Sequence, residues 1–182
     1  MAGSSPLDAV DPGRAKSLKG KIKDRLDDAG RHLDALGVAM SGFGSGFDLV
    51  EFRAAFDSKD PDQLNSVKAV ERGSEQLYNY IAELTRFGLE LSTNREPSDE
   101  MNARRDFVTL RDIGVITGMQ EARLQSLREL RRNLVHEYPG ISAAQVHEAA
   151  VLVSQEFRPF IRSYGAWVKQ SFAKAMNRDP EK

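Results

Sequence analysis

The sequence predicts an all-α protein, an antiparallel up-and-down bundle of four main helices with short extra helices. Three observations lead to this prediction. Apolar residues recur at steps of three and four over long segments, capping signals stand in front of several of these segments, and no stretch of useful length alternates as a strand does. The length of 182 residues suits a single domain, so we expect one helical domain over residues 13–176 between tails at 1–12 and 177–182.

The first helix is expected over residues 14–40. Its apolar positions follow the helical repeat: Leu18, Ile22, Leu26, Ala29, Leu33 and Leu36. The glycine-rich segment 41–46 should end this helix, since glycine is a strong helix breaker. A short helix over residues 47–56 is expected to follow.

The next start signal is Asp60-Pro61, three residues before Gln63. An aspartate caps the free N–H groups of a helix, and proline fits its first position. We expect this helix to run to about residue 91, followed by a loop over 92–97 and a helix over 99–112.

Two further capping boxes precede the remaining helices. Thr117 and Gln120 introduce the segment that ends near Tyr138, and Ser142 and Gln145 introduce the last helix. Pro159 lies inside that last helix and is expected to kink it or to break its hydrogen bonds locally.

Composition excludes several kinds of site. The formal net charge of −1 gives no overall signature of nucleic-acid binding, so any such contact needs a local basic patch. The chain has no cysteine, which rules out disulfides and thiolate chemistry. No motif suggests a metal or a cofactor, and no apolar stretch is long enough to span a membrane. We therefore expect a soluble, cytoplasmic protein with no metal, no cofactor and no membrane partner.

The segment from Leu124 to Tyr138 carries the most chemistry. On an ideal helix Leu124, Leu127, Leu130, Leu134, Val135 and Tyr138 share one apolar face, and Arg131 falls inside it. A charge in such a place is costly unless it is paired. The structural interpretation is an intramolecular salt bridge or a side chain that reaches water; the functional one is an anion site.

A second stripe on the same helix contains Arg128, Arg132 and His136. It could hold a phosphate, or it could be a solvated basic face. Arg131 and His136 lie about 140° apart on a regular helix, so they do not converge there. Either the last turn unwinds before Pro139, or two chains pair so that each site mixes residues of both. The other histidines, His32 and His147, are expected to be structural or exposed.

Residues 127–138, LRELRRNLVHEY, resemble the motif of the HEPN superfamily, and most closely its HepT-like toxins. In that motif an arginine is followed after four residues by a histidine, then by any residue and a tyrosine. Residues 107–116, FVTLRDIGVI, also resemble a connector of this family, and the likeness covers roughly residues 60–172.

The resemblance implies a metal-independent endoribonuclease that is active as a homodimer. Arg131 would neutralise the scissile phosphate and His136 would act as general acid and base on the ribose 2′-OH, because arginine stays charged and histidine moves protons near neutral pH. Arg128, Arg132, Asn133 and Tyr138 would support substrate binding. Family members are often paired with a nucleotidyltransferase antitoxin, which would adenylylate the motif tyrosine, here Tyr138.

One feature departs from the family. The residue directly after the motif arginine is usually Asn, Asp or His, whereas here Arg132 precedes Asn133. This exchange favours a second hypothesis, a non-catalytic binding module that engages a nucleotidyltransferase, a nucleotide or RNA without cutting. A plain structural bundle is the third.

Overall fold

The computed structural model describes residues 12–93, 102–136 and 140–177, apart from the side chains of residues 93 and 134–136. All secondary structure in these ranges is helical. The helices are α1 (Pro12–Ser41), α2 (Leu49–Phe56), α3 (Pro61–Thr93), α4 (Ala103–Asp112), α5 (Gly118–His136) and α6 (Ala143–Met176). The all-α prediction is therefore confirmed.

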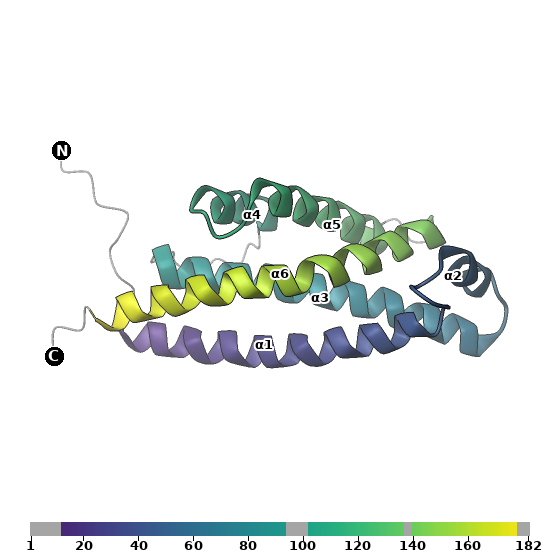
Figure 1. Ribbon diagram of the computed structural model, residues 1–182, viewed down its shortest axis with the longest axis horizontal. Helices are drawn as coiled ribbons and strands as arrows, with labels where there is room; N and C mark the ends of the chain where they lie inside the picture. Colours follow the sequence, from purple (N-terminus) through teal and green to yellow (C-terminus); the bar gives the residue numbers. More distant parts are fainter. Residues whose placement is uncertain (1–11, 94–101, 137–139, 178–182) are drawn as a thin grey trace.

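The three longest helices, α1, α3 and α6, lie side by side along the long axis of the molecule (Figure 1). In this view α1 runs from left to right, while α3 and α6 run from right to left. α5 packs mainly on α6 and α4 and reaches α3 at fewer points. α2 lies at the right-hand end, against α3 and α6.

The first helix buries the residues that its periodicity selects. These are Ala15, Leu18, Ile22, Ala29 and Leu36.

The glycine-rich turn then ends α1, with positive φ angles at Gly44 (72°), Gly46 (82°) and Phe47 (61°). The expected start of the short helix at residue 47 is wrong, because Phe47 has a left-handed backbone that a helix does not accept. The helix begins at Leu49 instead, capped by Asp48, whose Oδ1 accepts from the backbone N of Val50 at 2.8 Å.

α3 begins at Pro61, as its start signal predicts, and Asp60 Oδ1 accepts from the N–H of Asp62 at 3.0 Å. It continues to Thr93, so the expected end near residue 91 is two residues short and the first two positions of the predicted loop are helical. The rest of that loop lies outside the described residues.

The helix expected from residue 99 begins only at Ala103. Asn102 is its cap, with a side-chain oxygen that accepts from the N–H of Arg105 at 3.2 Å, so this residue is not helical. Residues 99–101 lie outside the described ranges.

Both later capping boxes are confirmed. Thr117 Oγ1 accepts from Gln120 N at 3.2 Å, and Gln120 Oε1 accepts from Thr117 N at 2.9 Å. The reciprocal pair at Ser142 and Gln145 starts α6 in the same way. α6 runs through Pro159 to Met176 as one element, so the proline does not end it.

α3 and α6 approach each other closely at Gly88. A Cβ at this position would lie only 2.3 Å from Cζ3 of Trp167 and 2.8 Å from Cε2 of Tyr164. Tyr164 is fully buried and its ring stacks on Phe160, with centroids 5.5 Å apart. The absence of a side chain at Gly88 is therefore what admits the aromatic side chains of α6.

Candidate functional site

α5 is held on α4 and α6 by apolar and polar contacts. Leu124 and Leu127 are almost completely buried, and Arg123 forms an ion pair with the buried carboxylate of Glu156 on α6. Gln125 Nε2 donates to the backbone oxygen of Arg104 at 3.0 Å. These contacts fix the helix that carries the arginine–histidine motif.

Arg131 lies half-buried between α5 and α3. Its Nη2 is 3.5 Å from Oε1 of Glu75, and the two side chains are 32% and 36% exposed. This distance is at the outer limit of a hydrogen bond. Arg131 Nε is buried and has no hydrogen-bond partner among the described residues. The salt-bridge interpretation of Arg131 is thus what the structure shows, with one donor of the guanidinium still unsatisfied.

The other two arginines share a carboxylate. Arg128 pairs with Oε1 of Glu129, and Arg132 Nη2 lies 3.4 Å from Oε2 of the same residue. Asn133, next along the helix, is half-buried. The two arginines of the stripe that could hold a phosphate therefore share a neighbouring acid, and the third member, His136, has no described side chain.

α3 contributes side chains that sequence reasoning did not single out. Tyr78 is buried, and this burial raises the pKa of its hydroxyl, while the nearby charges of Arg128 and Arg131 act in the opposite direction. Glu75 and Glu71 lie one and two turns before it on α3. Partial burial, and then the charge of Glu75, raise the pKa of Glu71 above its usual 4.5.

A sequence signal for these residues exists. Glu71, Glu75 and Tyr78 are spaced by four and three residues, which places them on one face of a helix. The spacing does not identify the partner of Glu75, because Arg131 lies 56 residues further along the chain.

Two motif residues fall outside what the structure describes. His136 is the last residue of α5, but its side chain is not among the described ones. Tyr138 lies in the segment 137–139, which is outside the described ranges. The meeting of Arg131 with His136 therefore stays a prediction.

The remaining histidines have structural partners, as expected. His147 Nε2 lies 2.7 Å from the backbone oxygen of Phe47, and its ring stacks on that phenylalanine. His32 Nδ1 lies 3.0 Å from the backbone oxygen of Asp28 and 3.4 Å from Tyr80 Oη.

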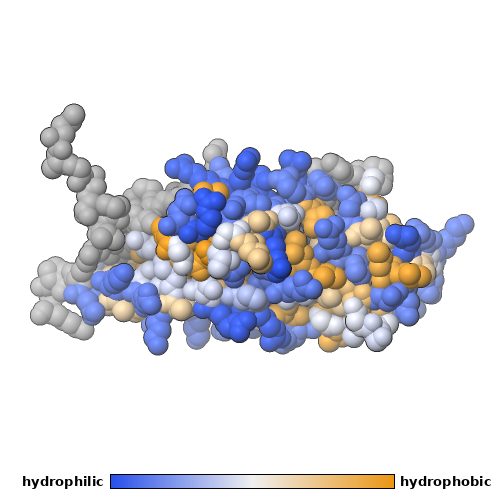
Figure 2. Space-filling model, turned by 45° about the horizontal axis from the view of Figure 1, so that its top comes forward, coloured by the Kyte–Doolittle hydropathy of each residue, from blue (hydrophilic) through white to orange (hydrophobic). Residues whose placement is uncertain are grey.

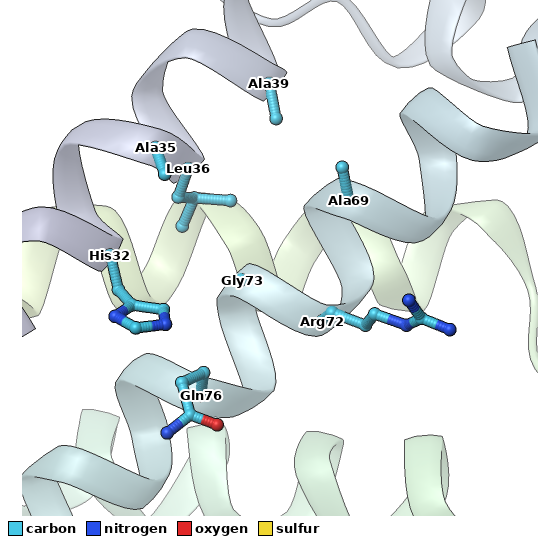
Figure 3. Close-up of a pocket in the computed structure, with 8 residues that line it drawn as sticks. All are labelled: His32, Ala35, Leu36, Ala39, Ala69, Arg72, Gly73 and Gln76. Carbon is cyan, nitrogen blue, oxygen red and sulfur yellow. The ribbon is translucent and has the colours of Figure 1, made fainter. Parts of the chain in front are cut away.

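A hollow of about 270 Å³ lies between α1 and α3, beside His32 (Figure 3). Small side chains such as Ala39 and Ala69 line much of it, and the guanidinium of Arg72 extends away from the imidazole. No cation converges with His32 there, so this hollow is a weaker candidate for phosphate chemistry than the α5 cluster, which consists of Arg128, Arg131 and Arg132.

Among the described residues no group of histidine and carboxylate side chains could hold a metal ion. Over the same residues, no helix combines the length and the apolar character needed to cross a membrane. The chemistry that the α5 cluster offers is the recognition of an anion by guanidinium groups.

No family model matches the chain, and no curated protein matches it either.

Proposed function

We propose that this chain is a HEPN-like, metal-independent endoribonuclease, the toxin of a toxin–antitoxin pair, and that it acts as a homodimer. In this proposal α1, α3, α5 and α6 are the four main helices of an antiparallel up-and-down bundle. The all-helical fold and the position of the arginine–histidine motif at the end of α5 support it.

The observation that carries the proposal is the state of Arg131. A buried Nε without an acceptor is unfavourable, and among the described residues the long contact with Glu75 leaves most of the guanidinium's donors available. A phosphate group would supply acceptors in the planar geometry that arginine favours. The half-buried setting would strengthen that contact, because the local dielectric constant is lower than in water.

His136 would complete the reaction from the end of α5. It would accept the proton of the ribose 2′-OH, whose oxygen attacks the neighbouring phosphorus while the 5′-oxygen leaves. The products would be a cyclic phosphate and a 5′-OH, and DNA would not react because it lacks the 2′-OH. The C-terminal end of a helix favours protonated histidine, which helps the same group to return a proton to the leaving oxygen.

The proposed regulator is a nucleotidyltransferase antitoxin that adenylylates Tyr138. The added phosphate would bring negative charge beside the arginines of α5 and would repel RNA from them. Intact-mass analysis after co-expression with such an enzyme should show additions of AMP that map to Tyr138.

The central test is RNA cleavage in the presence of a chelator. We expect His136→Ala to lower the rate by about 10²–10⁴, the usual contribution of a general acid or base. Arg25→Ala is a suitable control, because Arg25 belongs to an ion pair with Glu83, at 2.6 Å between Nε and Oε2, away from α5. Undiminished cleavage by a verified His136→Ala protein would contradict the proposal.

A second function, a non-catalytic binding module, is favoured by one observation. Arg128, Arg131 and Arg132 all have carboxylate partners, Glu75 or Glu129, so RNA would have to displace these. This hypothesis predicts tight binding of RNA or of a nucleotidyltransferase with no cleavage product across diverse RNAs.

A further inference from the structure

A second cationic surface lies between α1 and α6, where Figure 1 draws α1 below α6 and α5 above it. It consists of two rows of exposed cations, Lys16, Lys19 and Lys23 on α1 and Arg158, Arg162 and Lys169 on α6. We infer that these rows bind the phosphate backbone of a single-stranded nucleic acid. The inference goes beyond the proposed ribonuclease activity and does not require it.

Each row occupies one face of its helix. The lysines of α1 are spaced by three and four residues, and the cations of α6 by four and seven, which are helical repeats. Figure 2 shows hydrophilic residues over the left and middle parts of the lower edge of the molecule, the side on which α1 lies, and more apolar residues to the right.

Two contacts fix how the two rows lie relative to each other. Lys19 Nζ lies 4.3 Å from the ring centroid of Phe172, one turn beyond Lys169 on α6. At the other end, Arg158 lines the same hollow as Leu33 and Asp34 of α1. Because α1 and α6 run in opposite directions, the α1 row lies opposite the end of α6, and the α6 row lies opposite the part of α1 that follows Lys23. The two rows therefore follow one another along the line where α1 and α6 meet, and they come together near Lys23 and Lys169.

None of the six cations has an ion pair with a carboxylate in the part of the chain that the structure describes. Two acids, Asp27 and Asp34, share the face of the α1 row, so the cations exceed the acids by four on this surface. By comparison, the formal net charge of the whole chain is −1, so the positive charge is concentrated on this surface. Such a local concentration of charge attracts polyanions.

The surface has the shape that a linear polyanion needs. The α1 row is about 10 Å long and the α6 row about 16 Å, from the helical rise per residue. Gly165 lies within the α6 row, and Gly30 lies on the same face of α1 beyond Lys23. A Cβ at either position would meet nothing within 4 Å, so no side chain obstructs the surface at these two places. Beyond Arg158 the surface opens into a hollow of about 880 Å³ beside the glycine-rich turn.

A phosphate chain fits this surface better than a lipid membrane does. Membrane-surface helices combine cations with exposed apolar side chains that enter the bilayer. The exposed large apolar residues within the described ranges, Val38, Val50, Ile113 and Met119, belong to neither row. Contacts to phosphates do not distinguish RNA from DNA, so both should bind here equally well.

The test compares two triple variants of the full chain. Lys16→Gln/Lys19→Gln/Lys23→Gln removes the α1 row. Arg53→Gln/Lys59→Gln/Lys68→Gln removes three exposed cations from α2, from the connection after it and from α3. Binding of a labelled 20-nucleotide single-stranded DNA, which the proposed nuclease does not cut, is followed by fluorescence anisotropy at several salt concentrations. Thermal melts verify that both variants are folded.

We expect the α1 variant to bind at least tenfold more weakly at low salt and the control to stay within twofold of the parent. The slope of log K against log salt should fall by about 2, at about 0.7 for each lost phosphate contact. Equal losses in both variants, or no loss in either, would overturn the inference. So would a loss of binding to anionic vesicles with unchanged binding to DNA.

The same proteins separate this inference from the ribonuclease proposal. A protein that binds DNA through the lysine row but never cuts RNA would contradict the ribonuclease proposal alone. A protein that cuts RNA while its affinity is insensitive to the three lysines would contradict this inference alone.

Discussion

The molecule has two cationic regions that differ in how their charges are partnered. On α5 the arginines 128, 131 and 132 all have a carboxylate partner, supplied by Glu75 or Glu129. Between α1 and α6 the cations have none among the described residues. A partnered guanidinium is held in one place and can be aimed at one group, whereas an unpartnered lysine attracts charge over roughly 10 Å without fixing it. The first arrangement suits the recognition of one group at a fixed position, and the second suits the attraction of a polyanion from a distance.

The largest expected effect that tests this contrast is on Arg131. Arg131→Ala should lower RNA cleavage by about 10²–10³, the range for removing one donor that stabilises a transition state. Stability should change little, since an ion pair as exposed as the one with Glu75 contributes about 1 kcal/mol or less. Single-turnover cleavage and thermal melts measure the two effects. A large loss of stability with unchanged cleavage would instead assign Arg131 a purely structural role.

A smaller effect is expected for Glu75→Gln. Removing this acid frees the guanidinium of Arg131, so RNA should bind about two- to fivefold more tightly, which corresponds to the free energy of an exposed ion pair. A 2′-O-methyl RNA, which cannot be cut, allows the affinity to be measured directly. Glu83→Gln on the same helix is the matched control, because it releases Arg25 instead. Equal affinities for the two variants would show that Glu75 does not compete with the substrate.

The smallest effect concerns the way in which Glu71 makes the stability of the folded protein depend on pH. Burial and Glu75 raise its pKa in the folded protein, so the folded state binds this proton more tightly than the unfolded state does. Stability is therefore lost as the pH rises from the usual value of 4.5 through the raised pKa. Glu71→Gln removes this loss and should raise the melting temperature at pH 7 but hardly at pH 3.5. Glu148→Gln, at an exposed site on α6, should show no such difference between the two pH values.

Helix starts could be read from the sequence wherever a capping residue stands beside a helix former. Asp60-Pro61, Thr117 and Ser142 mark the starts of α3, α5 and α6 because each acts on N–H groups a few residues away. The errors occurred where a local conformation overrides the apolar pattern. Phe47 and Asn102 are both placed inside predicted helices, yet one has a positive φ and the other is a cap.

The sites were less predictable for a different reason. Arg131 could be selected because it interrupts an apolar face, but its partner Glu75 lies on another helix and follows no rule of spacing. The two rows of cations on α1 and α6 could not be predicted as one surface, because Lys19 and Lys169 are 150 residues apart in the sequence and the whole chain is close to neutral. Only the packing of α1 against α6 brings those charges together.

The close approach at Gly88 has a consequence for both cationic regions. The glycine sets how deeply Trp167 and Tyr164 enter the space beside α3, and through them it sets the position of α6. α6 borders α5 on one flank and α1 on the other. A single added methyl group at this uncharged position would therefore disturb two distant surfaces at once. In a genetic screen the substitution would appear as a loss of function, although the residue itself takes part in no reaction or binding.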